Sequence, residues 1–349
     1  MIQNSGYIFL LTLLGALTSA AQPSVQAPIK AVNKSQFFKE DKLVTLDLST
    51  DLKTLVSQKK KETWQPATVT FRFPDSSVIK EDIKLTARGE FRRTECFVPS
   101  IKLDFKNQTS PKLAKLGKLK LVVGCGTRTS DENLILKEFL VYKMYNLITD
   151  MSFRVRLLRI NYSDTREKIK RYSQYGFLIE DVDQMAKRNK CKEVAQPSFK
   201  TEKTDRQQMT LVALFQYMVG NTDWSVPNYH NIKLMRAGTD TVSFPYAVPY
   251  DFDFAGVVDA PYAIPSENLS ITSVRQRLYR GFPRTMDELE AALDIFRAKS
   301  VAIKKLVLEF ELLSKKEREI ILDYLDEFYK TIDSKTLVKR IFIDDARLE

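Results

Sequence analysis

The sequence predicts an α+β fold in two lobes, a β-rich N-terminal lobe that carries one helix and a helical C-terminal lobe. Two patterns lead to this prediction. Up to about residue 180, apolar and polar residues alternate in short runs, which is typical of strands with one buried face. From about residue 184 onward, apolar residues recur at helical spacing instead. The chain has 349 residues and is 44% hydrophobic, which is enough for a buried core in one large domain or in two lobes.

Alternation with a period of two marks the strands of the first lobe, which we expect to form one antiparallel sheet. The expected strands cover residues 43–48, 67–73, 83–88, 100–105, 118–123, 155–162 and 175–180. Residues 51–60, between the first two strands, can form a short helix.

One longer helix is expected among these strands, from Asp131 to Leu147. Apolar residues recur there at helical spacing, at Leu136, Leu140, Met144 and Leu147. Ser130 can cap the N-terminus of this helix, and Asp131 and Glu132 favour the positive end of the helix dipole.

The second lobe is expected to begin with an apolar helix at residues 206–220. Two later helices are marked by capping boxes, in which a Ser or Thr is followed three residues later by Glu. These boxes are Thr285 with Glu288 and Ser314 with Glu317. We place the first lobe at residues 36–184 and the second at 185–349.

The N-terminus is interpreted as an export signal over residues 1–21, followed by a flexible lead-in over 22–35. An apolar run from Tyr7 to Leu17 precedes small residues at 18–21. The run is short for a membrane span, and an uncleaved anchor is the alternative. We therefore expect an exported protein, periplasmic or extracellular, with no stable membrane span after cleavage.

The net charge and the histidine and cysteine content limit the classes of function that the chain can have. A formal net charge of +11 favours anionic partners such as nucleotide phosphates, and the export signal argues against nucleic acid. A single histidine and the lack of a CxxC motif argue against a zinc site. Export permits a disulfide, and Cys96 and Cys125, which flank expected strands of one sheet, are the candidate pair.

The segment after the 206–220 helix carries the candidate catalytic residue. Gly220-Asn221-Thr222-Asp223 forms a loop between apolar segments, and a second acidic motif, Pro249-Tyr250-Asp251-Phe252-Asp253, follows. Phosphoryl transfer from ATP uses one carboxylate to orient the attacking hydroxyl, and an Asn and an Asp to hold Mg²⁺. Asp223 is therefore the candidate catalytic residue. The alternative is that Asp223 or Asn221 caps a turn.

Asn231 is the first candidate metal ligand. It directly precedes a short expected strand at 232–234, and an amide oxygen can ligate a hard cation. Asn228 remains the alternative, because it follows Asp223 at the spacing of the protein-kinase catalytic loop.

Asp251 and Asp253 are the other candidate metal ligands. If they lie at a strand end, alternation puts both carboxylates on one side and Phe252 and Phe254 on the other. A divalent cation between the carboxylates would relieve their repulsion. The alternative is an exposed strand edge with both acids facing water.

The first lobe supplies the candidate phosphate-binding residues. Lys102 lies between apolar residues of a strand, and kinases use such a Lys to hold ATP phosphates, steadied by a Glu on the next helix. Glu138 is preferred over Glu132 for that Glu, and a solvent-facing Lys102 is the alternative. The turn Arg88–Arg93 contains one Gly and three cations and can cover phosphates, although it is not a GxGxxG loop.

Taken in order, these segments resemble the CotH family, spore-coat-type kinases with an atypical protein-kinase fold. The resemblance covers residues from about 80 to 260. Its segments are Arg88-Gly89, Ile101-Lys102-Leu103-Asp104-Phe105, the helix from Asp131 to Leu147, Gly176-Phe177-Leu178-Ile179-Glu180-Asp181-Val182-Asp183, and the two acidic motifs.

The resemblance implies a two-lobed protein-kinase-like fold and phosphorylation of Ser or Thr hydroxyls on a protein, dependent on ATP and on Mg²⁺ or Mn²⁺. It implies a hinge near the adenine at Glu180 to Asp183, phosphate binding by Lys102, catalysis by Asp223, and metal binding by Asn231, Asp251 and Asp253. Two alternatives stay open: a pseudokinase-type binding module without turnover, and a metal-dependent hydrolase that uses the same acids.

Overall fold

The computed structural model describes residues 1–2, 37–105, 110–113, 116–194, 199–238 and 242–347. Apart from residues 1–2, the predicted export signal and lead-in lie outside these residues. The elements described below belong to one compact unit that spans residues 32–349.

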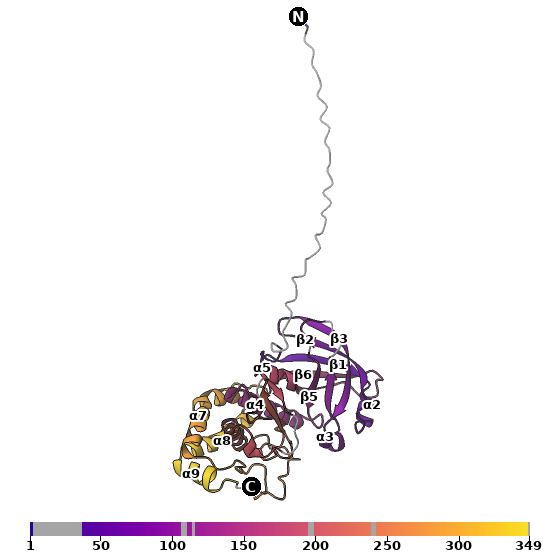
Figure 1. Ribbon diagram of the computed structural model, residues 1–349. Helices are drawn as coiled ribbons and strands as arrows, with labels where there is room; N and C mark the ends of the chain where they lie inside the picture. Colours follow the sequence, from indigo (N-terminus) through magenta and orange to yellow (C-terminus); the bar gives the residue numbers. More distant parts are fainter. Residues whose placement is uncertain (3–36, 106–109, 114–115, 195–198, 239–241, 348–349) are drawn as a thin grey trace. The chain divides into compact units, whose positions relative to one another are not determined.

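Seven strands of the described chain close into a barrel, in the spatial order β1-β2-β3-β4-β5-β7-β6 (Figure 1). The strands are β1 (Val44–Thr50), β2 (Gln65–Arg72), β3 (Val78–Arg88), β4 (Ser100–Asp104), β5 (Lys118–Val123), β6 (Val155–Asp164) and β7 (Tyr172–Ile179). β1 pairs antiparallel with β2 and parallel with β6, and the parallel pair closes the barrel.

The predicted two-lobed, kinase-like fold with an antiparallel β-rich first lobe is wrong, because the strands form a closed mixed barrel. Strand alternation shows which side chains face a core, and this pattern is the same in an open sheet and in a barrel. The closing pair joins Val44 to Leu158, which are far apart in the sequence. Local patterns therefore predicted the strands but not their closure.

The alternation of β4 and β5 sorts side chains between the barrel core and a solvent-accessible outer wall. Ile101 and Leu103 are fully buried in the barrel core, as are Leu119 and Leu121. The residues between them point to the other side, and Lys102 lies directly opposite Lys120 in the register of the two strands. The outer wall of the barrel therefore carries a pair of lysines.

The central helix α4 (Thr129–Ile148) packs between the barrel and the C-terminal helices. It contacts β5, β6 and β7 as well as α7 (Met286–Leu308), and most of its residues are buried. The helix begins at Thr129 with Arg128 as its N-cap, and the Asp131 carboxylate accepts a hydrogen bond from the Arg128 N–H. The predicted capping role of Ser130 is therefore wrong.

The remaining elements of the described chain are further helices and the strands of a small sheet of order β10-β9-β8. They are α2 (Leu52–Ser57), α3 (Glu90–Glu95), α5 (Val182–Arg188), β8 (Cys191–Glu193), the 3₁₀ turn η1 (Thr201–Lys203), α6 (Arg206–Val219), β9 (Ile232–Ala237), β10 (Tyr246–Pro249), α8 (Lys315–Ile332), α9 (Lys335–Lys339) and the π-helical turn η2 (Arg340–Asp344). The proposed boundary at residue 184 falls inside α5.

The predicted helix starts at residues 285 and 314 are confirmed. Thr285 and Glu288 form a reciprocal capping box at the start of α7. Ser314 accepts a hydrogen bond from the Glu317 N–H at the start of α8. Among the described residues, no helix is long and apolar enough to span a membrane.

Cys96 and Cys125, the candidate pair from the sequence, form a disulfide. It ties the end of α3 to the connection between β5 and α4. Cys191 is a free, buried thiol.

Loss of this disulfide should destabilise the protein. The bridge closes a segment with a sequence separation of 29 residues, and a loop of about this length restricts the unfolded chain by about 3 to 4 kcal/mol. The Cys96→Ser/Cys125→Ser variant should lose about this much free energy of unfolding in guanidinium titrations. In the control Cys191→Ala, which keeps the bridge, dithiothreitol should still lower the stability. A wild type that is equally stable with and without dithiothreitol would contradict the prediction.

Candidate functional site

A cleft of about 540 Å³ brings together residues that are far apart in the sequence. The outer face of the barrel and α3 supply Arg88, Arg92, Ser100 and Val122. The loop after α6 and the segment after β10 supply Asp223, His230, Asn231, Asp251, Asp253 and Phe254. Cations from the barrel side thus face carboxylates from the two loops.

The loop that carries Asp223 begins with a glycine that ends α6. Gly220 adopts a left-handed conformation with φ of 70°, which favours glycine, and it lies close to the hydroxyl of Tyr324. Asn221 then accepts a hydrogen bond from the Asp223 N–H at 3.0 Å. Asn221 therefore caps a turn, and that turn positions the backbone of Asp223 in the cleft.

Both carboxylate oxygens of Asp223 have partners. Its Oδ1 lies 2.9 Å from Nε2 of His230, and its Oδ2 accepts a hydrogen bond of 2.9 Å from Nδ2 of Asn231. The same amide nitrogen also donates to the Asp223 carbonyl oxygen. Because the amide nitrogen is used in this way, Oδ1 of Asn231 is the amide atom left to ligate a cation.

Asn231 lines the cleft directly before β9, as its position in the sequence predicts. Its φ is 52°, and its carbonyl oxygen accepts a hydrogen bond of 3.0 Å from the Tyr250 N–H. This bond joins the two loops of the site. Asn228 is exposed and is not among the residues that line the cleft, so placement favours Asn231 of the two candidates.

Asp251 and Asp253 both line the cleft, but they do not lie on a strand. β10 ends at Pro249, and Asp251 has a φ of 65°, with its N–H donating to the hydroxyl of Tyr142 at 2.8 Å. The left-handed residue breaks the alternation that the sequence predicted. Phe252 is fully buried, whereas Phe254 lines the cleft beside the carboxylates.

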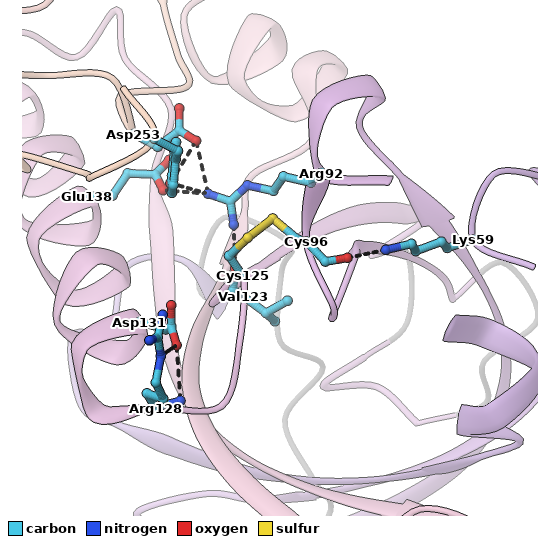
Figure 2. Close-up of a disulfide and its surroundings, with 10 residues drawn as sticks. Lys59, Arg92, Cys96, Val123, Cys125, Arg128, Asp131, Glu138 and Asp253 are labelled. Carbon is cyan, nitrogen blue, oxygen red and sulfur yellow. Dashed lines mark hydrogen bonds and ion pairs between the residues drawn. A yellow bond between two sulfur atoms is a disulfide. The ribbon is translucent and has the colours of Figure 1, made fainter. Parts of the chain in front are cut away.

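A buried arginine from α3 lies between two carboxylates (Figure 2). The guanidinium of Arg92 is 3.1 Å from Oδ2 of Asp253 and 3.8 Å from Oε2 of Glu138, and it also donates to the carbonyl oxygen of Val123. The sequence analysis expected Glu138 to steady Lys102. In the structure Glu138 faces Arg92, and Glu132 pairs with Arg159.

Burial and mutual repulsion shift the ionisation of this group. Burial, followed by the charge of Asp251, raises the pKa of Asp253 to about 6, although Arg92 lowers it. Burial and the charges of Asp253 and Asp251 raise the pKa of Glu138 well above its ordinary value. Burial lowers the pKa of Arg92, but the charges of Tyr262, Asp253 and Glu138 outweigh it and raise that pKa above its usual range. The cluster therefore keeps its cation, and the pKa values of both carboxyl groups that face Arg92 are raised.

A second cavity, of about 290 Å³, is lined in part by Tyr250, the residue that precedes Asp251 of the cleft. It contains Lys102 and Glu180, two of the predicted site residues. The other lining residues are Lys118, Lys120, Phe153, Ile179, Asp181, Val182, Lys233 and Tyr250. The carboxylate of Glu180 forms an ion pair of 2.9 Å with Arg188, so this side chain is engaged within the protein.

Lys120 is the most perturbed cation of this second cavity. Burial, followed by the charge of Arg88, lowers the pKa of Lys120 to about 8, while Asp251 acts in the opposite direction. Its ammonium lies 4.6 Å from the centre of the Tyr250 ring. A lysine that is crowded by other cations gains from an anionic ligand.

Sequence patterns assign no site role to Lys120 and Lys233 of the second cavity. They place Arg92 only within the turn Arg88–Arg93, and for His230 they favour a turn residue over a phosphate contact. Lys120 could have been found, because it alternates with Leu119 and Leu121 on a predicted strand. Arg92 lies on a six-residue helix that gives no periodic signal. Arg280 donates to the carbonyl oxygens of Thr222 and Trp224 and so supports the Asp223 loop.

Among the described residues, no group of three or more His, Cys, Asp and Glu side chains is placed to hold a metal ion. Comparison of the chain with protein-family models gave no match, and comparison with curated proteins gave no significant match. The geometry and the charges of the cleft are therefore what indicates a function.

The raised pKa of Asp253 predicts a stability difference that depends on pH. An unfolded Asp has a pKa of about 3.9, against about 6 in the folded protein. Between these values the folded state binds more protons, so ionisation of Asp253 lowers the stability as the pH rises. Asp253→Asn lacks this titration, and removal of its charge also eases the ionisation of Glu138. The free energy of unfolding of Asp253→Asn should therefore rise relative to wild type between pH 4 and 6.

Urea titrations across this pH range check the prediction, with Asp323→Asn, an exposed acid on α8, as the matched control. The control should differ from wild type by a nearly constant amount. A constant difference for Asp253→Asn as well would mean that Asp253 ionises normally in the folded protein.

Proposed function

We propose that the protein is a phosphotransferase that uses ATP and Mg²⁺ or Mn²⁺ to phosphorylate Ser or Thr hydroxyls, on a protein substrate. The observation that carries the proposal is the difference in charge between the two cavities. One is lined by four lysines, Lys102, Lys118, Lys120 and Lys233, against two carboxylates, Glu180 and Asp181, of which Glu180 pairs with Arg188. The other is lined by three carboxylates, an amide, a histidine and two arginines. A nucleoside triphosphate bound to a divalent cation carries an arrangement of charge that is complementary to these two cavities.

The second cavity is suited to the nucleotide. Phe153 and Tyr250 offer aromatic surface for a base, and the lysines offer cations for the phosphates. The pair of Lys102 and Lys120 on the outer barrel wall would hold α- and β-phosphates. The γ-phosphate would then reach Tyr250–Asp251, where a residue of the cavity is followed by a residue of the cleft.

The donor atoms fit a hard divalent cation. Asp251, Asp253 and Asn231 offer oxygen ligands. Burial is the main cause of the raised pKa of Asp253, and the charge of Asp251 adds to it, so a cation at the two carboxylates would relieve their repulsion. Asp253 already accepts hydrogen bonds from Arg92 and Tyr262, so Asp251 is the less engaged carboxylate. Mg²⁺ is usually held by one or two carboxylates together with substrate phosphates. The cation would neutralise charge on the transferred phosphoryl group.

Asp223, which lines the cleft, is proposed to serve the removal of the proton from the attacking hydroxyl, either directly or through a neighbouring group. The resemblance of residues from about 80 to 260 to the CotH family points to the same activity, and the apolar run within residues 1–21 supports an exported site of action. The alternative is a nucleotide-binding module without turnover. Measurements of nucleotide binding and of phosphate transfer distinguish this module from a phosphotransferase.

Nucleotide binding should depend on metal and on Asp251. At one hundred times its dissociation constant, a ligand stabilises a folded protein by about 2.7 kcal/mol, which appears as a shift of several degrees in thermal unfolding. Wild type should shift with ATP and Mn²⁺ more than with ATP alone, and Asp251→Ala should lose the metal-dependent part. Lys120→Met should lose most of the shift with ATP.

Glu311→Ala and Lys299→Met, exposed residues away from both cavities, are the matched controls and should bind like wild type. If Asp251→Ala binds as tightly as wild type, the metal site is elsewhere. If wild type binds no nucleotide under any condition, the proposed function fails.

Phosphate transfer should depend on Asp223. Removal of a group that acts on the transferred proton lowers turnover by about 100- to 10,000-fold. Asp223→Asn should therefore bind ATP with Mn²⁺ as wild type does, but transfer little ³²P from γ-labelled ATP to casein or to its own chain. Metal-dependent nucleotide binding by a wild type that transfers no phosphate would favour the binding module instead.

A further inference from the structure

His230 is the only histidine of the chain, and its ring lies in the cleft. Nε2 of the ring lies 2.9 Å from Oδ1 of Asp223. An imidazole ring has two nitrogen atoms, so a carboxylate can hold one of them while the other is left to accept a proton. The ring of His230 can therefore take part in proton transfer beside the candidate catalytic carboxylate.

The backbone fixes the position of this ring. Ser225 and His230 exchange two backbone hydrogen bonds, each of 2.9 Å, so the loop between them is closed. The residues on either side of His230 both have left-handed conformations, with φ of 53° at Tyr229 and 52° at Asn231. Tyr229 is held through its hydroxyl by the carbonyl oxygen of Val194, and Asn231 is held by its bonds to Asp223. The loop thus presents the ring from a rigid frame.

The hydrogen-bond partners of Asp223 indicate different roles for Asp223 and His230. Its Oδ2 is engaged by Asn231 and its Oδ1 by His230, so the carboxylate is already used within the loop. When Nε2 of His230 donates to Asp223, Nδ1 is the ring atom that accepts a proton. The side chain of His230 is also more exposed than that of Asp223, 55% against 35%. A hydroxyl on a bulky protein substrate meets the imidazole more readily than the carboxylate.

We propose that His230 is the proton acceptor of the site and that Asp223 orients its ring. The inference rests on the proposed phosphotransferase function and assigns a further catalytic residue to it. The substrate hydroxyl loses its proton to Nδ1 of His230 as its oxygen bonds to the γ-phosphorus of ATP. The bond from that phosphorus to the β,γ-bridging oxygen breaks, ADP leaves, and the imidazolium then releases the proton to solvent.

The nearby charges are compatible with this role. Asp223 faces the ring directly and stabilises the imidazolium that forms. The guanidinium of Arg280 donates to the carbonyl oxygens of Thr222 and Trp224, and its charge interacts with that of Asp223. Asp251 and Asp253 line the same cleft.

Chemical rescue tests the proposal. His230→Ala should lower kcat for transfer from γ-labelled ATP to casein, with Mn²⁺, by about 100-fold or more. KM for ATP and the thermal shift with ATP and Mn²⁺ should stay at wild-type values. Added imidazole should restore part of the lost rate to His230→Ala, because the vacated site is open to solvent. Imidazole should restore nothing to His230→Gln, which fills the site, or to Asp223→Ala, which lacks the orienting carboxylate.

The outcomes separate this inference from the proposed function. If wild type transfers phosphate and His230→Ala retains the wild-type kcat, His230 is not the acceptor, although the protein is still a phosphotransferase. A loss of kcat that imidazole does not restore in His230→Ala assigns the residue a structural role and also overturns the proposal. If wild type transfers no phosphate to casein, to its own chain or to water, both the function and the role of His230 are overturned.

Discussion

The buried guanidinium of Arg92 is the interaction on which the rest of the site depends. It joins α3 to the barrel through Val123, to α4 through Glu138, and to the segment after β10 through Asp253. Removal of one partner from such a group leaves an uncompensated buried charge, which typically destabilises a protein by about 3 to 5 kcal/mol. The disulfide lies beside this contact and fixes the end of the same short helix (Figure 2). The disulfide and the ion pairs of Arg92 therefore both restrain α3 and the residue that follows it.

The barrel contributes more to the site than a scaffold, because its outer wall is one side of the two cavities. Closure of the strands fills the inside with apolar side chains, and the alternation of β4 and β5 then directs Lys102 and Lys120 outward. The carboxylates come from two loops that are tied together by the bond between Asn231 and Tyr250. The opposite charges thus come from different parts of the chain. The charge of Asp251 acts on the pKa of Lys120, so the two sets of charges lie within electrostatic range of each other.

Features with a local cause could be predicted from the sequence. The strands, the long central helix and the caps at Thr285 and Ser314 depend on alternation and on residues within one turn. Closure of the barrel depends on β1 meeting β6, which no local pattern encodes. In the site, Asp223 and Asn231 were predicted because a loop motif precedes a strand. The orientation of Asp251 was not predicted, because a left-handed φ at an aspartate has no sequence signal comparable to glycine.

Residues with a left-handed backbone conformation explain why the site needs closely packed surroundings. Tyr229, Asn231 and Asp251 all have positive φ, and all three lie in the two loops that form the cleft. Conformations of this kind are unfavourable by about 1 kcal/mol or more each and persist only where neighbouring contacts determine them. Those contacts are present, since Phe252 is fully buried beside Tyr142 and the Asp251 N–H is bonded to the Tyr142 hydroxyl. The free energy of the packed core is therefore what holds the polar side chains of the cleft in one geometry.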